Sequence, residues 1–242
     1  MVQVKTGIQG LDAMLYGGIP EGNQVVVAGG PGAGKTLLCF EFLYRNAQMG
    51  NPGVFFALEE EPSRMLLNAK SAFTDFSDID KMITDKKMII DGKEPSDKML
   101  AASDPSGYEF GKVVSELEDL ISSIGATRVV IDSASVLNML ISDPIAYRRA
   151  MISLISDMRR LNVTTLLTME ADNPERSKLQ FKPEFFLFDG IISMYQTGEE
   201  EKRIRAMEII KMRGSRHSFV TTPYEINPSG FRVFSAEDTS LY

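Results

Sequence analysis

A glycine-rich octet, Gly-Gly-Pro-Gly-Ala-Gly-Lys-Thr at positions 29–36, limits the folds that this chain can adopt more than any other part of its sequence does. It follows the apolar run Val25–Ala28 and precedes Leu37–Leu43, which has the residues of a helix. The order of strand, glycine-rich turn and helix is that of a P-loop. In such a loop, glycines let backbone N–H groups surround an anion, and the helix directs its positive dipole end at the same point. We therefore expect a bound nucleoside triphosphate; a loop that only resembles the motif is the alternative.

The residues of this loop have separate expected roles. Lys35 is expected to reach the β- and γ-phosphates, and the hydroxyl of Thr36 is expected to bind Mg²⁺. ATP and Mg²⁺ are therefore the predicted ligands. The predicted nucleotide contacts in this segment are Gly30, Pro31, Gly32, Ala33, Gly34, Lys35, Thr36 and Leu37.

The composition limits the classes of partner. The chain has 242 residues and a formal net charge of −7. This acidic balance disfavours non-specific binding to nucleic acid, which needs a basic face, although a local basic patch would still be compatible with it. The N-terminus lacks the charged start and apolar core of a signal peptide. No apolar run approaches the roughly eighteen residues of a membrane span, so we expect no membrane insertion.

Cys39 and His217 are the only cysteine and histidine of the chain. A lone thiol cannot form an intrachain disulfide, which makes an intracellular, cytoplasmic location the default expectation. Cys39 falls on the apolar side of the helix after the P-loop and is predicted to be a buried structural thiol. With one residue of each type, a zinc site built by the protein is not expected.

Strands and helices alternate along most of the chain, which predicts an α/β fold with a mainly parallel, buried sheet and flanking helices. The last third is expected to add an antiparallel extension. One domain over residues 1–242 is the simplest organisation, and residues 91–106 and 170–184, rich in charges and turn formers, are the expected partner or pore surfaces. Further strands are expected at 54–58, 88–90, 128–132, 163–168, 191–196, 203–213, 219–226 and 231–234, and helices near 37–49, 62–69, 107–124 and 143–161.

Asp132 ends an apolar strand. A P-loop protein places at such a point the aspartate that holds Mg²⁺, opposite the Thr36 hydroxyl. Aspartate at a strand end is also common as a helix cap or turn residue, so the position alone leaves both roles open. The P-loop upstream favours the metal role.

Three acidic residues, Glu59, Glu60 and Glu61, follow the strand 54–58 directly. Hydrolysis requires a carboxylate that orients a water molecule near the γ-phosphate, and we predict Glu60, ahead of Glu59, as that base. This hypothesis places the strand 54–58 beside the P-loop strand. Glu61 is assigned to the start of the helix at Pro62, and the alternative is that all three acids interact with the dipole of that helix.

Lys211 and Arg213 end another expected strand and precede a turn that contains His217. Because side chains alternate with a period of two along a strand, the two cations project on one face. Paired cations at a strand tip are suited to stabilising charge on a phosphoryl group in transfer. A solvated basic turn that balances Glu199–Glu201 is the alternative, and His217 by itself would be an ordinary turn residue.

Several further segments accompany these motifs: Thr6–Asp12, Gly17–Gly22, Leu58–Glu60, Val130–Ser133, Thr164–Thr168 and Lys211–His217. Together with the P-loop they resemble the KaiC/RecA-like ATPases, particularly the archaeal single-domain KaiC-like proteins, from about Lys5 to Phe234. The resemblance implies a RecA-like P-loop core and a homohexameric ring with ATP between subunits. It implies that Glu59 and Glu60 are the catalytic carboxylates and that Asp132 lies at the metal. It also implies that Lys211 and Arg213 touch the neighbouring subunit's γ-phosphate, with His217 close to that nucleotide.

Two departures limit what this resemblance implies. The clock proteins of the family have two such domains in tandem, whereas one is recognised here. In their second domain a Ser and a Thr ahead of an Asp are autophosphorylated; that Asp aligns with Asp189, and the Ser and Thr align with Phe185 and Phe186. We therefore expect slow ATP hydrolysis in a regulatory or signalling ring and no autokinase activity at these positions. The alternatives are a recombinase-like, DNA-handling ATPase and a nucleotide-gated assembly platform with little turnover.

Overall fold

The computed structural model describes residues 2–92, 108–141, 143–171, 183–197 and 204–234. Its centre is a nine-stranded sheet with the strand order β11-β10-β9-β8-β3-β7-β6-β4-β5, and a separate two-stranded sheet pairs β1 with β2. The strands are β1 (Gln3–Val4), β2 (Ile19–Pro20), β3 (Gln24–Gly29), β4 (Gly53–Ala57), β5 (Met88–Gly92), β6 (Arg128–Asp132), β7 (Thr164–Glu170), β8 (Gly190–Thr197), β9 (Ile204–Met212), β10 (Thr222–Asn227) and β11 (Gly230–Val233).

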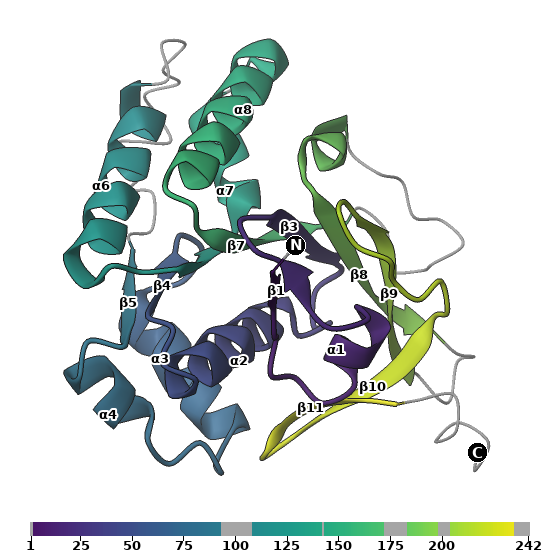
Figure 1. Ribbon diagram of the computed structural model, residues 1–242. Helices are drawn as coiled ribbons and strands as arrows, with labels where there is room; N and C mark the ends of the chain where they lie inside the picture. The colour runs from purple at the N-terminus through teal and green to yellow at the C-terminus, as the bar shows by residue number, and fades with distance from the viewer. Residues whose placement is uncertain (1, 93–107, 142, 172–182, 198–203, 235–242) are drawn as a thin grey trace.

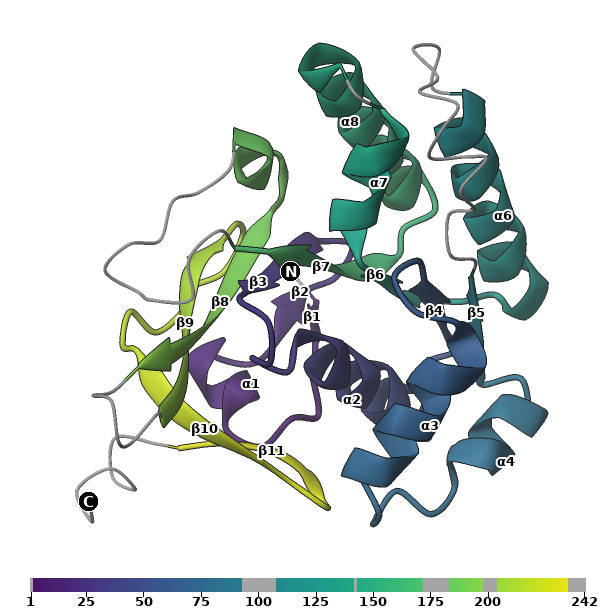
Figure 2. The ribbon, with the colours of Figure 1, turned by 180° about the vertical axis from the view of Figure 1, so that it is seen from behind.

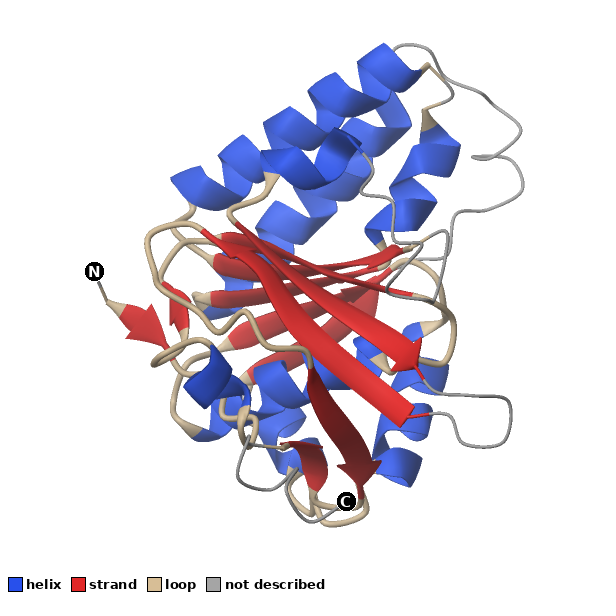
Figure 3. Cartoon of the chain, turned by 90° about the vertical axis from the view of Figure 1, so that its right-hand side faces the viewer, coloured by secondary structure: helices blue, strands red, loops and turns tan. Residues whose placement is uncertain are grey.

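Helices cover both faces of this sheet, which makes a three-layer α/β fold (Figure 3). In Figures 1 and 2, α6, α7 and α8 lie together on one side of the sheet, and α2, α3 and α4 lie on the other. The helices are α1 (Leu11–Met14), α2 (Lys35–Gln48), α3 (Pro62–Ala72), α4 (Ile79–Thr84), α6 (Tyr108–Ile124), α7 (Ala134–Leu140), α8 (Pro144–Arg160) and the 3-10 turn η2 (Pro183–Leu187).

The strand β3 shows how the sequence builds two cores. Its side chains alternate between the faces of the sheet, so Val25 and Val27 pack with α2 in one apolar cluster. Val26 and Ala28 pack with α8 in the other cluster. Both faces are covered, which is why the strand is a continuous apolar run rather than an alternating one. Cys39 is fully buried in the α2 cluster, as predicted, and burial raises the pKa of its thiol.

The predicted class is confirmed: β3 to β8 form the parallel part of the sheet, and β8, β9, β10 and β11 pair antiparallel. The predicted neighbour of the P-loop strand is wrong. The strand predicted at 54–58 is β4, and β7 and β6 lie between it and β3. The periodicity of a strand buried on both faces is the same wherever it lies in a sheet, so the sequence pattern carries no strand order.

Smaller differences concern the ends of elements. The strand predicted from Phe219 begins at Thr222, and the side chains of Phe219 and Val220 are exposed instead. Of the predicted loop 91–106, Asp91 and Gly92 complete β5, and residues 93–106 lie outside the described residues. Residues 170–184 likewise fall mostly outside them, with Glu170 in β7 and Pro183 and Glu184 in η2. The described helices include none with the length and apolar character that a bilayer crossing requires.

Candidate nucleotide site

The P-loop joins β3 to α2 in the predicted order. Gly32 and Gly34 have φ angles of +74° and +91°, which glycine adopts without the steric cost of a Cβ. Pro31 is exposed at the loop, and Leu37 is half-buried in the first turn of α2. Lys35 Nζ donates to the carbonyl oxygens of Gly29 at 2.9 Å and Gly30 at 3.2 Å. The ammonium group therefore lies at the mouth of the loop, where an anionic ligand would meet it.

Asp132 lies at the end of β6 and is buried. Its Oδ1 accepts a hydrogen bond from Thr168 Oγ1, and a hydrogen bond joins its carboxylate to Thr36. Burial raises the pKa of Asp132, and the two hydroxyls and the Lys35 charge oppose that shift. Thr36 and Asp132, which are far apart in the sequence, are thus brought together. A hydroxyl and a carboxylate are the hard oxygen ligands that Mg²⁺ takes, so this pair fits the ion.

Thr168 was given no role from the sequence, although its strand was predicted. It lies near the end of β7, the strand that separates β6 from β3. The only signal for it is a hydroxyl near the carboxyl end of a buried strand. A polar residue at that point needs a partner, and Asp132 supplies it.

The three acidic residues after β4 point to different partners. The backbone N–H groups of Leu58 and Glu59 donate to Asp132 O at 2.6 and 3.3 Å, and the Glu59 charge raises the pKa of Asp132. Glu60 instead accepts from Asn68 Nδ2 at 2.9 Å and pairs with Arg64 Nε at 3.0 Å, both on α3.

Glu61 caps the first turn of α3, where its carboxylate accepts from the Arg64 backbone N–H at 3.2 Å. That is the role the sequence assigned to it. Of the two predicted catalytic carboxylates, Glu59 is the one coupled to the Asp132 site in this conformation.

Lys211 and Arg213 share one face, as predicted, and both side chains approach the Phe186 carbonyl oxygen at 3.5 Å. Lys211 Nζ also donates to Phe188 O at 2.5 Å, and Arg213 Nη1 lies 3.6 Å from Asp189 Oδ1. Burial, and then the Arg213 charge, lowers the pKa of Lys211. The structure thus brings the two cations together at η2.

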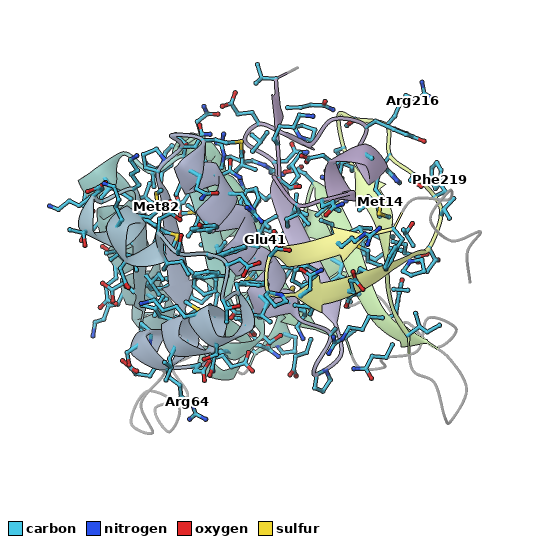
Figure 4. All side chains as sticks on the ribbon, turned by 90° about the horizontal axis from the view of Figure 1, so that it is seen from below. Met14, Glu41, Arg64, Met82, Arg216 and Phe219 are labelled. Carbon is cyan, nitrogen blue, oxygen red and sulfur yellow. The ribbon has the colours of Figure 1, made fainter. Side chains whose placement is uncertain are left out.

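These cations lie at the end of the sheet opposite to the P-loop. The backbone N–H of Arg213 donates to Asp189 O, and that of Asp189 donates to Gln24 O. Arg213 is therefore level with Gln24, the first residue of β3, whereas the P-loop begins at Gly29, the last. Five residues of extended strand span about 17 Å, which puts the chain's own phosphate cradle out of reach of this side chain. In Figure 4, Arg64, the partner of Glu60, and Arg216, which follows the cations, lie at opposite sides of the molecule.

His217 belongs to the turn that follows the cations. Its Nδ1 is 2.9 Å from Ser218 O, and its ring packs against the Phe219 ring with centroids 4.7 Å apart. Phe219 is 82% exposed and projects from the rim of the molecule in Figure 4. The Ser218 backbone N–H that follows the imidazole donates to Met14 O at 2.7 Å, which holds this turn against α1.

Comparisons with known proteins identify the family of this chain and its fold. The family model for "ATPase: KaiC" matches residues 4–238. The chain belongs to the KaiC family of ATPases. Its relatives in that family include a UPF0273 protein of Aeropyrum pernix, 32% identical over 236 residues that cover 96% of this chain and 93% of the relative. They also include the circadian clock oscillator protein KaiC of Thermostichus vulcanus, 30% identical over 233 residues.

The crystal structure of the KaiC-like protein PH0186 from Pyrococcus horikoshii has the same fold. It superposes with a TM-score of 0.81 at 30% identity and covers 97% of this chain and 99% of that one. By contrast, the KaiC-family chain described here spans 44% of the length of the Thermostichus clock protein. Membership of the family and the P-loop geometry together make this an ATP-binding ATPase domain with a RecA-like fold.

Proposed function

We propose that this KaiC-family protein binds Mg·ATP between two copies of the chain and hydrolyses it slowly, as a homohexameric ring in the cytoplasm. Residues 1–242 act as a single domain, with a regulatory or signalling output. One chain supplies the P-loop, and the neighbouring chain supplies the cations. The observation that carries this proposal is the position of Lys211 and Arg213, at the end of the sheet remote from the P-loop of their own chain.

The chain's own residues divide the work on the first side of the site. Backbone N–H groups of the P-loop, with the start of α2, hold the β- and γ-phosphates. Lys35 exchanges its contacts with the Gly29 and Gly30 carbonyls for the phosphate oxygens. Thr36 and Asp132 would hold Mg²⁺, which neutralises phosphate charge when bound.

Glu60 and Glu59 are proposed to orient the attacking water molecule, with Glu60 as the base. In this structure Glu60 is paired with Arg64 and Asn68, so its side chain has to leave these partners to act. Glu59 needs no such movement to influence Asp132. Separate substitutions of Glu59 and Glu60 therefore distinguish the contribution of each carboxylate.

On the second side, Lys211 and Arg213 would approach the γ-phosphate of the neighbour and stabilise its charge, with His217 near the same nucleotide. In the isolated chain both cations contact the Phe186 carbonyl, and burial lowers the pKa of Lys211. A phosphate would give these positive charges a stronger acceptor than a neutral carbonyl does. Neither Phe185 nor Phe186 has a hydroxyl, so no phosphoryl transfer to these positions is part of the proposal.

The test is complementation between two inactive variants, mixed as nucleotide-free chains. Lys35→Ala removes the P-loop side, and Arg213→Ala removes the cation side. Random mixing of equal amounts pairs an intact P-loop with an intact cation face at about one quarter of the interfaces. Phosphate release should therefore recover to about a quarter of the wild-type rate.

The matched control mixes Lys35→Ala with Glu60→Gln. Both changes lie on the P-loop side, so no interface in that mixture is complete and no activity should return. Equal recovery in both mixtures, or none in the first, would contradict the assignment of Arg213 to the neighbouring site.

The pairing of Glu60 with α3 favours a second candidate function, a nucleotide-gated assembly platform with little turnover. In that case ATP would set the oligomeric state, and a partner would read it. Light-scattering mass with and without Mg·ATP, measured beside phosphate release, separates the two. ATP-dependent assembly with no phosphate release would favour the platform.

A further inference from the structure

The β10–β11 hairpin packs directly against the P-loop of its own chain. Tyr224, in β10, is 4% exposed, and its hydroxyl donates to the Ala33 carbonyl oxygen at 2.5 Å. This bond joins residues 191 positions apart in the sequence. No motif in the sequence pointed to Tyr224, and the nucleotide site described above does not use it.

The hydrogen bond from Tyr224 also fixes the direction of the next backbone N–H, because the Ala33–Gly34 peptide is planar. The carbonyl of Ala33 and the N–H of Gly34 belong to the same trans peptide unit, so they point in opposite directions. A phosphate cradle requires its N–H groups to face the anion and its carbonyls to face away. A donor that holds the Ala33 carbonyl on the protein side therefore keeps the Gly34 N–H on the phosphate side.

Gly34 is the residue at which such an anchor is needed. Its φ is +91°, and glycine crosses between left- and right-handed conformations with little steric cost. The hairpin also covers it, because a Cβ at Gly34 would meet Ile226 Cδ1 at 2.7 Å. The peptide that precedes α2 is thus restrained by one hydrogen bond from β10 and by the apolar side chains of Ile226 on β10 and Phe231 on β11, which lie over Gly34.

The hairpin itself is fixed to the P-loop helix. The backbone N–H of Phe231 donates to Glu41 Oε2 at 2.6 Å, and Arg45 Nη2 donates to Ser229 O at 2.7 Å. The ring of Phe231 stacks on Tyr224 with centroids 5.5 Å apart. Figure 4 shows Glu41 on α2 beside the yellow strands of this hairpin. Burial raises the pKa of Tyr224, so its hydroxyl keeps its proton and remains a donor.

We propose that Tyr224 is a positioning residue for ATP binding: its hydroxyl holds the Ala33–Gly34 peptide in the orientation that directs the Gly34 N–H at the phosphates. The inference rests on the ATP-binding role of the P-loop and assigns Tyr224 no contact with the nucleotide. The β10–β11 hairpin then preorganises the P-loop for ATP, so that ATP binding does not have to order the loop.

The test is Tyr224→Phe, which removes the hydroxyl and keeps the ring. Tyr147→Phe is the matched control, because Tyr147 on α8 is also buried and its hydroxyl has no hydrogen-bond partner among the described residues. ATP affinity should fall about tenfold in Tyr224→Phe and remain at the wild-type value in the control. In steady-state turnover KM should rise by a similar factor, while kcat stays within about twofold.

Two further measurements keep the result decisive. Mg-pyrophosphate, which has no base or sugar, should lose affinity by the same factor as ATP. Without ligand, hydrogen exchange of the 29–36 segment should be faster in Tyr224→Phe than in Tyr147→Phe.

Wild-type ATP affinity in Tyr224→Phe would overturn the inference, as would a loss of affinity for ATP that pyrophosphate does not share. A lower Tm with unchanged affinity would also overturn it, by assigning the bond to stability alone. None of these outcomes affects the proposed ATP-binding role of the P-loop, which would be contradicted if Lys35→Ala bound ATP normally.

Discussion

Replacement of Glu41 by alanine should lower the stability of the protein substantially, although the residue lies outside the nucleotide site. The Glu41 side chain is 1% exposed, accepts the Phe231 N–H at 2.6 Å, and pairs with Arg45 Nη2 at 3.2 Å. Alanine leaves that buried N–H without an acceptor, which costs about 1–3 kcal/mol. The space left by the side chain adds about 1 kcal/mol. Arg45 keeps its bond to Ser229 O, so its contribution to the loss is small.

The total of about 2–4 kcal/mol corresponds to a decrease in Tm of about 5–15 °C for a chain of this size. Differential scanning calorimetry without nucleotide measures it. Asp85→Ala is the control, because it removes an ion pair of the same i,i+4 spacing, Lys81–Asp85, from an exposed helix surface and should leave Tm unchanged. Glu41→Gln keeps an acceptor for Phe231 and should lose little at neutral pH. If Glu41→Gln is as unstable as Glu41→Ala, the charge of Glu41 holds the hairpin, and its role as an acceptor for the Phe231 N–H is refuted.

The same carboxyl group gives a pH dependence with a definite sign. Burial raises the pKa of Glu41, against the opposing effects of the Phe231 N–H and the Arg45 charge. A pKa that is higher in the folded than in the unfolded state favours folding most at low pH, and this contribution is lost as the pH rises through the folded value. Glutamine does not titrate. The stability of Glu41→Gln relative to the wild type should therefore increase from about pH 4 to pH 7 in urea unfolding curves. The opposite slope would mean that the Arg45 charge outweighs burial.

The remaining predictions concern the nucleotide. Glu60→Gln should bind ATP normally and lose phosphate release, whereas Glu59→Gln should lose less; the reverse order in a phosphate-release assay would make Glu59 the base. Asp132→Asn should leave the nucleotide-free Tm equal to or above that of the wild type, because burial raises the pKa of Asp132 and so disfavours its charged form. The wild type should gain about 4 kcal/mol, or about 8–16 °C in Tm, at a ligand concentration about a thousandfold above Kd. Asp132→Asn should lose this Mg·ATP-dependent gain, and a variant that keeps it would exclude Asp132 from the metal.

The parts of the fold that the sequence predicts are those with a local signal. Val25–Ala28, followed by the octet 29–36, predicts the β3–loop–α2 unit, because apolar runs and glycine turns act on neighbouring residues. The buried strand ending at Asp132 and the antiparallel extension follow from similar patterns. The insertion of β7 between β3 and β6 does not, because it depends on how the chain crosses over through α7 and α8.

The candidate site divides in the same way. Lys35, Thr36 and Asp132 are predictable because each occupies a motif position at a strand or helix end. The bond from Thr168 to Asp132 and the bond from Tyr224 to Ala33 join residues that only the tertiary fold brings together. Glu60 pairs with Arg64 and Asn68, which lie four and eight residues later on α3, and this local pairing competes with the role predicted for that carboxylate.

The antiparallel return of β9 along β8 has a consequence for symmetry. It carries Arg213 back to the end of the sheet at which β3 starts, so under the proposed function each chain binds phosphate at one end and presents its cations to a neighbour at the other. Two such chains related by a twofold axis would place like ends together and complete no site. If the site is shared as proposed, head-to-tail contact completes one site, an open row of chains leaves one site incomplete at its end, and a closed ring leaves none. Activity per chain should therefore rise steeply with concentration and level off once the circles close.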